Sequence, residues 1–361
     1  MTGLIDTRSD VAVLAINFNS GDRILRVIRA LAEQEQRFSR VLVVDNASED
    51  GSDQKVQEVF PEVEILAMGQ NAGLSKARNA GLEALDTPVV LMLDHDIYVQ
   101  PGSVTAMLDA MRTSKSQVVC PRIRLQPEKN IVQADGATAH FVGTLGLCNA
   151  YRTLADTPAT SGPVDGCIGA CMLVARDEVL AAGGFEPMMF FYFEDLEFSL
   201  RMRALGHQIW CEAGAEVLHE RGDGTPGLSF RGKGTYPEHR AYFSMRHRLL
   251  TIFLHYRWRT ILLLAPALVL YELASLVSAI GMGKPRAWGK AWIWQVQNRR
   301  EILRRRGWIQ SRRVRGDRDL LSGGPLPLAP GFLTSRTQKS LAHGFSLLLD
   351  GYWRLARRFV A

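Results

Sequence analysis

The segment from Val11 to Cys120 alternates short β-branched apolar runs with helix-length amphipathic stretches. Continuous apolar strands separated by helices are typical of a parallel sheet that is covered on both faces. The pattern therefore predicts an α/β fold with a mainly parallel central sheet, in which ligands bind beyond the carboxyl ends of the strands. The apolar runs are Val11–Ile16, Val41–Val44, Val63–Leu66, Val89–Leu93 and Val118–Cys120.

Polar side chains follow three of the predicted strands at the points where they end. Asn17 and Asn19 follow the first run, Asp45 follows the second, and Asp94 and Asp96 follow the fourth. Carboxylate oxygens suit Mg²⁺ or Mn²⁺, so the last two are predicted to hold a divalent cation against a diphosphate. Asp45 is predicted to accept a hydrogen bond from a nucleoside. The alternatives are a solvated turn for the acidic pair and a helix N-cap formed by Asn46 or Ser48 beside Asp45.

A second stretch near the same edge runs from Gln70 to Asn79. Asn71 and Gly73 indicate a turn and a helix start, and Arg78 adds a cation, which favours phosphate or base contact over a capped surface helix. The chain has neither a Gly-x-Gly-x-x-Gly fingerprint nor a Gly-Lys-Ser/Thr phosphate loop, and this weakens dehydrogenase and nucleoside-triphosphatase interpretations.

A second acidic cluster, Glu194 and Asp195, follows the aromatic run Phe190–Phe193. Partial desolvation by aromatic rings raises the proton affinity of a carboxylate, as a general base for an incoming hydroxyl requires. The alternative is a pair of acids at a helix start. His219 ends a predicted strand and is expected to complete a metal shell or to touch the diphosphate, unless it is a structural histidine.

The composition argues against disorder and against a disulfide framework. The chain has 361 residues, 47% of them hydrophobic, and its five cysteines lack a Cys-x-x-Cys spacing, which predicts buried thiols. The first ten residues lack the order of a signal peptide, so we expect a cytoplasmic protein. We predict three regions: 1–120 and 121–240 as two halves of the catalytic domain, and 241–361 as a helical, basic, membrane-associated region. A Gly-rich loop at 222–234 is expected to be a mobile lid.

The predicted C-terminal region contains an apolar segment, Ile261–Gly281, that is long enough to span a membrane. Basic residues flank it on both sides, and Lys284–Arg318 alone holds twelve Lys or Arg against two acids. A single crossing would violate the positive-inside bias, so a re-entrant hairpin hinged near Pro266 or a helix lying in the interface is favoured over it. The further alternative is a buried core helix. The segment Gln338–Val360 predicts another amphipathic helix.

Taken together, these segments resemble the family 2 glycosyltransferases with the GT-A fold, in particular their bacterial rhamnosyltransferase-like branch. The resemblance covers roughly residues 11 to 250, and several motifs in the family's order are more specific than any one of them. The matching pieces are Asn17-Phe18-Asn19, Val43-Val44-Asp45-Asn46-Ala47-Ser48, Asn71-Ala72-Gly73, Asp94-His95-Asp96, Gly169-Ala170-Cys171-Met172, Gly183-Gly184-Phe185, Phe190-Phe191-Tyr192-Phe193-Glu194-Asp195-Leu196-Glu197 and His219.

The resemblance implies an inverting transfer of one sugar from a nucleotide-diphosphate sugar to a glycan or glycolipid acceptor. Asp195 would be the base, and Asp94, Asp96 and His219 would hold the metal and the diphosphate. Arg246 with His247 stands where relatives commonly show Arg-Asn, which suggests a further donor contact. The Gln-x-x-Arg-Trp motif of processive relatives is missing, so single addition is favoured.

Two other functions remain open from the residues alone. A nucleotidyltransferase would also use carboxylates and Mg²⁺, but it would want a basic phosphate loop after the first strand, which residues 17–21 lack. A nucleic-acid-binding protein would use the Arg-rich block. The tryptophans in that block adjoin an apolar segment, which favours the anionic inner face of a cell membrane over nucleic acid.

Overall fold

The computed structural model describes residues 4–220, 237–328 and 335–361, which divide into two compact units. Unit 1 is built from Met1–Ala137, Leu147–Met202 and His207–Arg221, and unit 2 from Thr138–Gly146, Arg203–Gly206 and Gly222–Ala361. The predicted lid at 222–234 lies outside the described residues.

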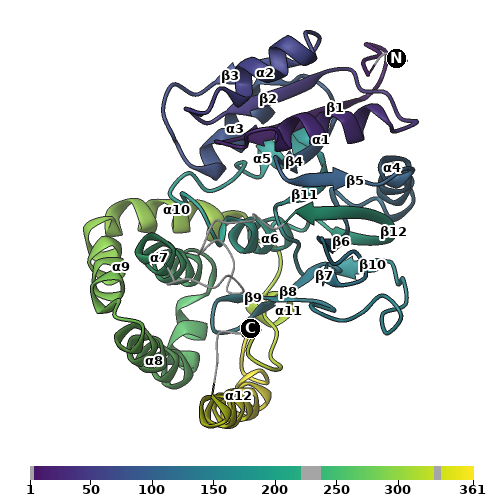
Figure 1. Cartoon of the computed structure of the whole chain (residues 1–361). Helices are drawn as coiled ribbons and strands as arrows, with labels where there is room; N and C mark the ends of the chain where they lie inside the picture. Colours follow the sequence, from purple (N-terminus) through teal and green to yellow (C-terminus); the bar gives the residue numbers. More distant parts are fainter. Residues whose placement is uncertain (1–3, 221–236, 329–334) are drawn as a thin grey trace. The chain divides into compact units, whose positions relative to one another are not determined.

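Unit 1 contains a ten-stranded sheet (Figure 1). Its strands are β1 (Val11–Asn17), β2 (Val41–Asp45), β3 (Glu64–Ala67), β4 (Val89–Asp94), β5 (Ile97–Val99), β6 (Val118–Gln126), β7 (Val132–Ala134), β10 (Gly162–Val164), β11 (Cys171–Ala175) and β12 (Ile209–Glu220). The order is β10-β12-β6-β11-β4-β1-β2-β3, with β5 paired to β12 and β7 paired to β6.

The strand directions confirm the prediction of a mainly parallel central sheet. β1 pairs in parallel with β2 and β4, β2 pairs in parallel with β3, and β6 pairs in parallel with β12. β11 inserts between β4 and β6 and runs antiparallel to both. Because β11 and β12 come from the predicted second half, the two halves of the catalytic domain share one sheet.

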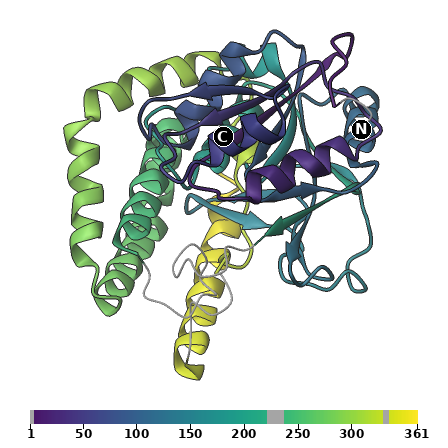
Figure 2. The ribbon, with the colours of Figure 1, turned by 45° about the horizontal axis from the view of Figure 1, so that its top comes forward.

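Alternate residues of β1 serve the two faces of the sheet. Val11, Val13 and Ala15 belong to a core that includes Ile24, Ile28 and Leu31 of helix α1 (Arg23–Ala32) on one face (Figure 2). On the other face, α3 (Leu74–Ala84) approaches so closely that a Cβ atom on Gly81 would lie 2.2 Å from Leu14. Helices on both faces explain why every residue of β1 is buried and apolar up to Asn17.

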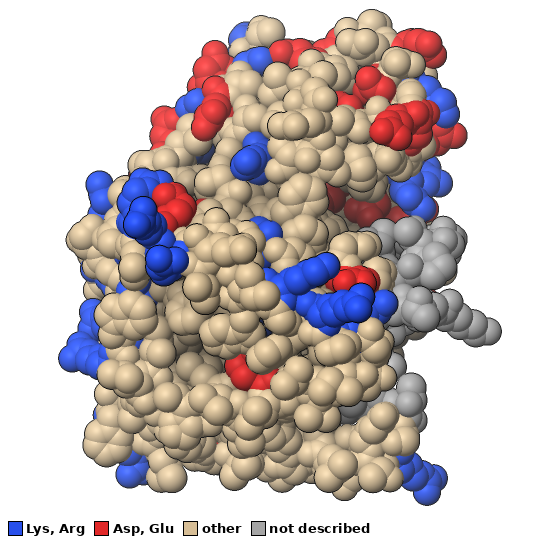
Figure 3. Space-filling view, turned by 90° about the vertical axis from the view of Figure 1, so that its left-hand side faces the viewer, with Lys and Arg blue, Asp and Glu red and all other residues tan. Residues whose placement is uncertain are grey.

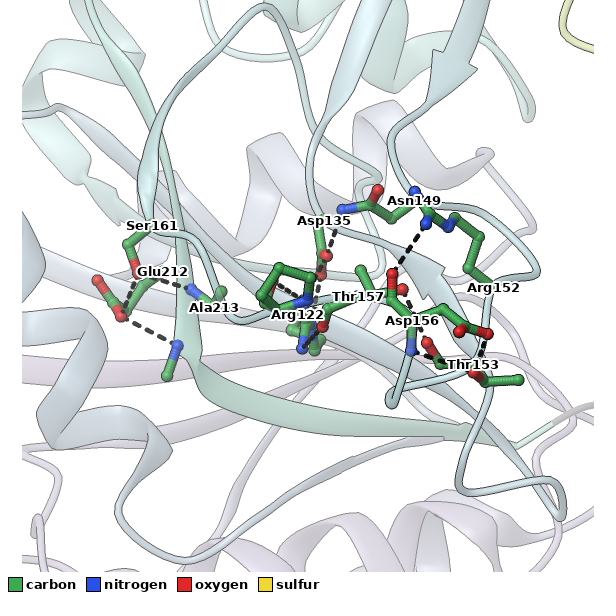
Figure 4. Close-up of polar contacts among 12 residues, drawn as sticks. Arg122, Asp135, Asn149, Arg152, Thr153, Asp156, Thr157, Ser161, Glu212 and Ala213 are labelled. Atoms are coloured by element: carbon green, nitrogen blue, oxygen red, sulfur yellow. Dashed lines mark hydrogen bonds and ion pairs between the residues drawn. The ribbon is translucent and has the colours of Figure 1, made fainter.

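The irregular segment after β6 folds around a buried ion pair, which Figure 4 shows with its neighbours. Arg122 donates from Nε and Nη2 to the two carboxylate oxygens of Asp135 at 2.7 and 2.6 Å, and Asn149 also donates to Asp135. Arg122 further donates to the carbonyl oxygens of Thr157 and Pro158. The guanidinium therefore joins the turn at Asp135 to the loop at Thr157 and Pro158, in a segment that has little regular structure of its own.

We expect Arg122→Leu to destabilise unit 1 by about 3–5 kcal/mol, because Asp135 is 6% exposed and would keep an uncompensated charge. Chemical denaturation monitored by circular dichroism measures this loss. Arg112→Leu is the matched control, since Arg112 pairs with Asp109 at the surface and the exposed pair contributes less than about 1 kcal/mol. Equal losses of unfolding free energy in Arg122→Leu and Arg112→Leu would contradict a stabilising role for the buried pair of Arg122 and Asp135.

The helices of unit 2 are α7 (Glu238–His255), α8 (Trp258–Gly281), α9 (Pro285–Gln297), α10 (Arg299–Arg312), α11 (Asp317–Leu320) and α12 (Arg336–Ala356). α9 packs against α7 and α8, and α10 packs against α7. The basic block Lys284–Arg318 is not uniformly exposed. Arg306 and the side chain of Arg313 are buried, and both donate to carbonyl oxygens at the C-terminal end of α7, where cations stabilise a helix.

The apolar segment forms one continuous helix, α8, which contains Pro266. A hairpin hinged near Pro266 is therefore wrong for this structure. The buried-core alternative is also wrong, because only 22% of the most apolar window of α8 is buried. By length and composition, α8 is the one helix among the described residues that could cross a membrane. All five cysteines are free thiols, and four of them are buried, as predicted.

Candidate functional site

The loop after β2 is organised by a buried carboxylate. Asp45 is 4% exposed and accepts hydrogen bonds from Asn17 at 2.8 Å and from the backbone and hydroxyl of Ser48 at 2.9 and 2.6 Å. Asn17 is fully buried and also donates to Ser52. The helix that follows, α2 (Ser52–Val59), begins after Gly51, so the alternative of an N-cap at Asn46 or Ser48 is wrong. A nucleoside contact from Asp45 stays a prediction, and it would have to add to these internal bonds.

Two exposed asparagines come from the neighbouring loops: Asn19 follows β1, and Asn71 lies between β3 and α3. The side chain of Asn19 accepts from the backbone of Glu49 at 2.8 Å, and its own backbone is left-handed, with φ 47°. The side-chain oxygen of Asn71 accepts from Asn46 and from the backbone of Gly73. These bonds shape the rim beyond the carboxyl ends of β1 and β2, where a ligand of an open α/β sheet binds.

The structure brings His219 to Asp96, although 122 residues separate them in sequence. β5 follows Asp96 directly and pairs with β12, so that His219 lies opposite Ile97. The imidazole Nε2 is 3.5 Å from Asp96 Oδ2, and Nδ1 is 2.8 Å from Gln133 Oε1. Burial opposes charge on Asp96, but the neighbouring His219 outweighs it and holds the pKa of Asp96 below its ordinary value.

A single buried guanidinium joins the two acidic clusters. Arg78 is 1% exposed and donates from Nη2 to Asp94 at 3.0 Å and from Nη1 to Glu194 at 3.3 Å. Nη2 also donates to the carbonyl oxygen of Gly169 at 2.6 Å. A direct contact of Arg78 with a donor phosphate stays a prediction, because in this structure the guanidinium is enclosed and serves the acids.

Two close backbone approaches hold the parts around Arg78 in place. A Cβ atom on Gly169 would lie 2.6 Å from Nη1 of Arg78, so only glycine leaves room for the guanidinium there. A Cβ atom on Gly73 would lie 2.6 Å from the Phe190 ring, and Leu74 donates its backbone N–H to the Phe190 carbonyl at 2.7 Å. The Asn71–Gly73 turn is thereby tied to the aromatic run that precedes the second acidic cluster.

The two acids of the second cluster occupy different surroundings at the start of α6 (Glu194–Ala204). Glu194 is 5% exposed and is bound to Arg78, whereas Asp195 is half-buried and accepts from the backbone N–H of Leu196. Tyr192 and Phe193 both have φ of 67°, a left-handed conformation that costs non-glycine residues about 1–2 kcal/mol each. This strained turn starts α6 at the acids and leaves Asp195 as the more accessible of the two acids.

Burial raises the pKa of both acids. The pKa of Glu194 rises to about 7, because burial and the charge of Asp195 together outweigh the attraction of Arg78. Burial also raises the pKa of Asp195, partly offset by the backbone N–H of Leu196 and by Arg78. A carboxylate with raised proton affinity in a half-buried position suits general-base catalysis.

Glu194 should make unfolding pH-dependent, because its pKa lies above the value of about 4.3 that it has when unfolded. The folded protein then holds a proton that the unfolded chain releases, so the stabilisation is complete below about pH 4 and is lost as pH rises towards 7. We expect the unfolding free energy of the wild type, relative to Glu194→Gln, to fall by roughly 1–3 kcal/mol between pH 4.5 and 7.5. Urea titrations at both pH values test this, and parallel pH profiles would contradict it.

Arg246 lies in α7 of unit 2, among aromatic rings. Its guanidinium is 4.1 Å from the centre of the Trp294 ring and also lies over Tyr242 and Phe243. Burial lowers the pKa of Arg246 despite the hydrogen bond to the Tyr242 hydroxyl. The proposed donor contact of Arg246 stays a prediction.

The predicted metal ligands have suitable donor atoms, and all have other partners. The side chains of Asp94, Asp96 and His219 are 25%, 22% and 23% exposed, so each is open to a ligand. Over residues 4–220, 237–328 and 335–361, no group of three or more His, Cys, Asp or Glu side chains is placed so that it could hold a metal ion. A cation would share Asp94 with Arg78 and Asp96 with His219, and the carboxylate oxygens fit Mg²⁺ or Mn²⁺.

Comparison with known families decides what kind of enzyme carries this site. The model of "Glycosyl transferase family 2" matches residues 12–177. Residues 12–177 therefore form a family 2 glycosyltransferase domain. The matched range includes Asp45, Arg78, Asp94 and Asp96, and it ends before Glu194. This assignment decides against the nucleotidyltransferase alternative. The match ends before the Arg-rich block Lys284–Arg318, so it does not test nucleic-acid binding by that block.

Individual relatives of this glycosyltransferase agree with that assignment. It is 28% identical over 237 residues to N-acetylglucosaminyl-diphospho-decaprenol L-rhamnosyltransferase of Mycobacterium tuberculosis, covering 59% of this chain and 76% of the relative. It is 24% identical over 251 residues to the low-salt glycan biosynthesis hexosyltransferase Agl10 of Haloferax volcanii, covering 67% and 75%. These names support the predicted rhamnosyltransferase-like branch.

A solved structure supports the fold. The glycosyltransferase aligns with GalNAc-T7, crystallised with UDP, GalNAc and Mn²⁺, at a TM-score of 0.54 and 12% identity. The alignment covers 68% of this chain but only 47% of that one. The likeness confirms a GT-A-type fold, and it carries no conclusion about ligands.

Several residues that organise the site escaped the sequence analysis. Asn79 exchanges two hydrogen bonds with the backbone of Phe185, at 2.8 and 2.7 Å, and so fastens α3 to the turn before the aromatic run. Gln133 orients His219. Arg201 pairs with Glu197, both fully buried, and donates to the carbonyl oxygen of Gly184. For Asn79, the sequence does offer a signal: two polar residues, Arg78 and Asn79, stand side by side in an amphipathic helix, which indicates that they have partners outside the helix.

Proposed function

We propose that this glycosyltransferase moves one sugar, with inversion, from a nucleotide-diphosphate sugar to a hydroxyl of a lipid-linked or cell-envelope glycan. The observation that carries the proposal is the bridge from Asp94 through Arg78 to Glu194. Through this one side chain, Asp94 lies close to Glu194 and its neighbour Asp195. The acids proposed to hold a cation against the donor diphosphate are thereby near the proposed base. The printed name of the mycobacterial relative, with its decaprenol-linked substrate, supports a lipid-linked acceptor.

In the proposed reaction the acceptor hydroxyl oxygen attacks the anomeric carbon on the face opposite the leaving group. Its proton passes to a carboxylate oxygen of Asp195, while the bond between the sugar and the diphosphate breaks and its electrons leave with the nucleoside diphosphate. Asp94 and Asp96, with His219, would hold a divalent cation that neutralises charge on the departing diphosphate. Glu194 and Arg78 position these groups.

Calorimetric titration with UDP, dTDP and GDP, each with and without Mn²⁺, tests the donor half of the proposal. We expect one nucleotide to bind in a metal-dependent manner. Binding of none of them to folded protein would overturn the proposal.

The same titration tests the metal ligands. Asp96→Ala should weaken metal-dependent nucleotide binding by roughly tenfold or more, because a hard oxygen ligand and its charge are lost. Asp86→Ala is the control, since the Asp86 side chain is 90% exposed and lies at the surface in a pair with Arg40. Unchanged binding by Asp96→Ala would remove Asp96 from the proposed metal shell.

A further inference from the structure

Helix α8 has one buried face and one exposed apolar face. Its exposed side chains recur at spacings of three, four or seven residues, which places them in one stripe along the helix. Buried residues, among them Leu264 and Ala279, lie on the opposite side. The stripe consists of Leu262, Val269, Leu273, Val277 and Ile280, which are 54–75% exposed. We call these five residues the α8 stripe.

The single acidic residue of α8, Glu272, is directed away from the α8 stripe. Glu272 accepts hydrogen bonds from the indole N–H groups of Trp288 and Trp292 in α9, at 3.2 and 3.1 Å. It also forms an ion pair with Arg248 of α7. A carboxylate with three partners inside unit 2 anchors α8 to α7 and α9. The helix is therefore fixed along one side, unlike a lone spanning helix with lipid all round it.

A second apolar strip lies on the neighbouring helix α12. Leu341, Leu348 and Leu355 are seven residues apart, share one face, and are 59–70% exposed. The hydroxyl of Tyr352 donates to the Leu263 carbonyl oxygen at 2.5 Å, which bonds α12 to α8. Rows of exposed apolar side chains on two bonded helices are unusual in a monomeric soluble protein and indicate a surface that binds something.

Cations accompany these two apolar strips. Figure 3 shows a broad area of mainly uncharged side chains in its lower part, with Lys and Arg mostly at the margins. The exposed cations of unit 2 include Arg286, Lys290, Arg299, Arg300, Arg336, Lys339, Arg354, Arg357 and Arg358. Apolar side chains bordered by cations match the acyl chains and head groups of an anionic lipid leaflet.

We propose that unit 2 binds an anionic membrane from one side, inserting the α8 stripe and the α12 strip into one leaflet without crossing it. The biological role of this membrane surface rests on the proposed function, since a lipid-linked acceptor would be presented at the membrane. Crossing is disfavoured by Glu272, which holds α8 to α7 and α9, and by the cations at both ends of α8.

Flotation with preformed vesicles tests the proposal. The wild-type enzyme is expected to float with vesicles of phosphatidylglycerol and phosphatidylcholine, and less with phosphatidylcholine alone or at high salt. Leu262→Ser, Leu273→Ser and Val277→Ser combined should lower the partition coefficient by roughly tenfold or more, because each removes apolar area from the acyl region. Val59→Ser is the matched control, a 46% exposed apolar residue of α2 in unit 1.

Three results would overturn the proposal. The first is wild-type enzyme that does not float, or a triple variant that floats as well as the wild type. The second is a lipid-free dimer that dissociates in the triple variant, which would give the stripe to a second copy of the chain. The third is protection of Lys284–Arg318 from trypsin added outside the vesicles, which would show a crossing.

Nucleotide titration of the same variants separates this inference from the proposed function. Folded variants that bind nucleotide like the wild type but no longer float support the membrane surface. Wild-type enzyme that floats without binding any nucleotide would contradict the proposed nucleotide-sugar donor and leave the membrane-binding surface supported.

Discussion

Asp195→Asn is expected to lower the turnover number for sugar transfer by about 10²–10⁴-fold, the usual contribution of a positioned general base. Asparagine keeps the shape of the side chain and can still accept from the Leu196 backbone, but it cannot take the proton of the acceptor hydroxyl. Donor binding should stay within about twofold of the wild type, because the proposed ligands of the metal and diphosphate lie outside α6. Single-turnover kinetics and nucleotide titration separate the two effects.

Asp177→Asn is the matched control for this prediction. Asp177 is also an acid in the first turn of a helix, α5 (Arg176–Ala181), but its side chain is 81% exposed and pairs only with Arg176 at the surface. Its replacement should leave transfer unchanged. Near-normal turnover by the Asp195→Asn enzyme would contradict the base assignment, whatever the control does.

Arg78→Met is expected to destabilise the folded enzyme by about 3–5 kcal/mol, because it removes a fully buried cation and leaves Glu194 buried without its partner. Methionine fills much of the same space, so the loss measures charge and hydrogen bonds more than a cavity. The Gly169 carbonyl also loses its donor. Urea denaturation measures the change in unfolding free energy.

Two further variants make the Arg78 prediction specific. Arg40→Met is the control, because Arg40 forms a similar two-pronged pair with Glu64 at the surface, with side chains 31% and 45% exposed, and such pairs contribute about 0–1 kcal/mol. Adding Glu194→Gln to Arg78→Met should recover part of the loss, since the stranded acid becomes neutral. Full additivity of the two changes would show that Arg78 and Glu194 do not interact.

The sequence predicted the central strands β1, β2 and β4 well because they are buried on both faces. Each predicted run became a strand with bounds within about two residues, except that the run at Val118 extends to Gln126. The antiparallel insertion of β11 was not predictable, because Cys171–Val174 reads as an apolar strand whatever its direction and neighbours. The packing of α8 against α7 and α9 was also not predictable from the sequence. Hydropathy describes the whole apolar segment, whereas the burial of one face depends on the contacts of Glu272 with Trp288, Trp292 and Arg248.

The candidate site shows the same limit at the level of side chains. Asp94, Asp96, Glu194 and Asp195 were found from their places at element ends. The sequence did not predict the different roles of Glu194 and Asp195, because these roles depend on which of the two acids Arg78 binds. Arg78 lies more than a hundred residues before these acids in the sequence. From the sequence alone, a cation near the edge of the sheet is expected to bind phosphate, and only the structure shows that Arg78 binds carboxylates.

The place of β11 in the sheet has a consequence for how the chain matures during synthesis. Val118 and Val119 of β6 pair with β11, which is made about fifty residues later, and β6 pairs next with β12, which is made later still. At roughly 5–20 residues per second, the start of β6 waits several seconds on the ribosome with an open edge. Translation slowed between codons 120 and 220 should therefore lower the yield of folded enzyme or raise its demand for chaperones. The first four parallel strands, complete by Asp94, can assemble before that interval begins.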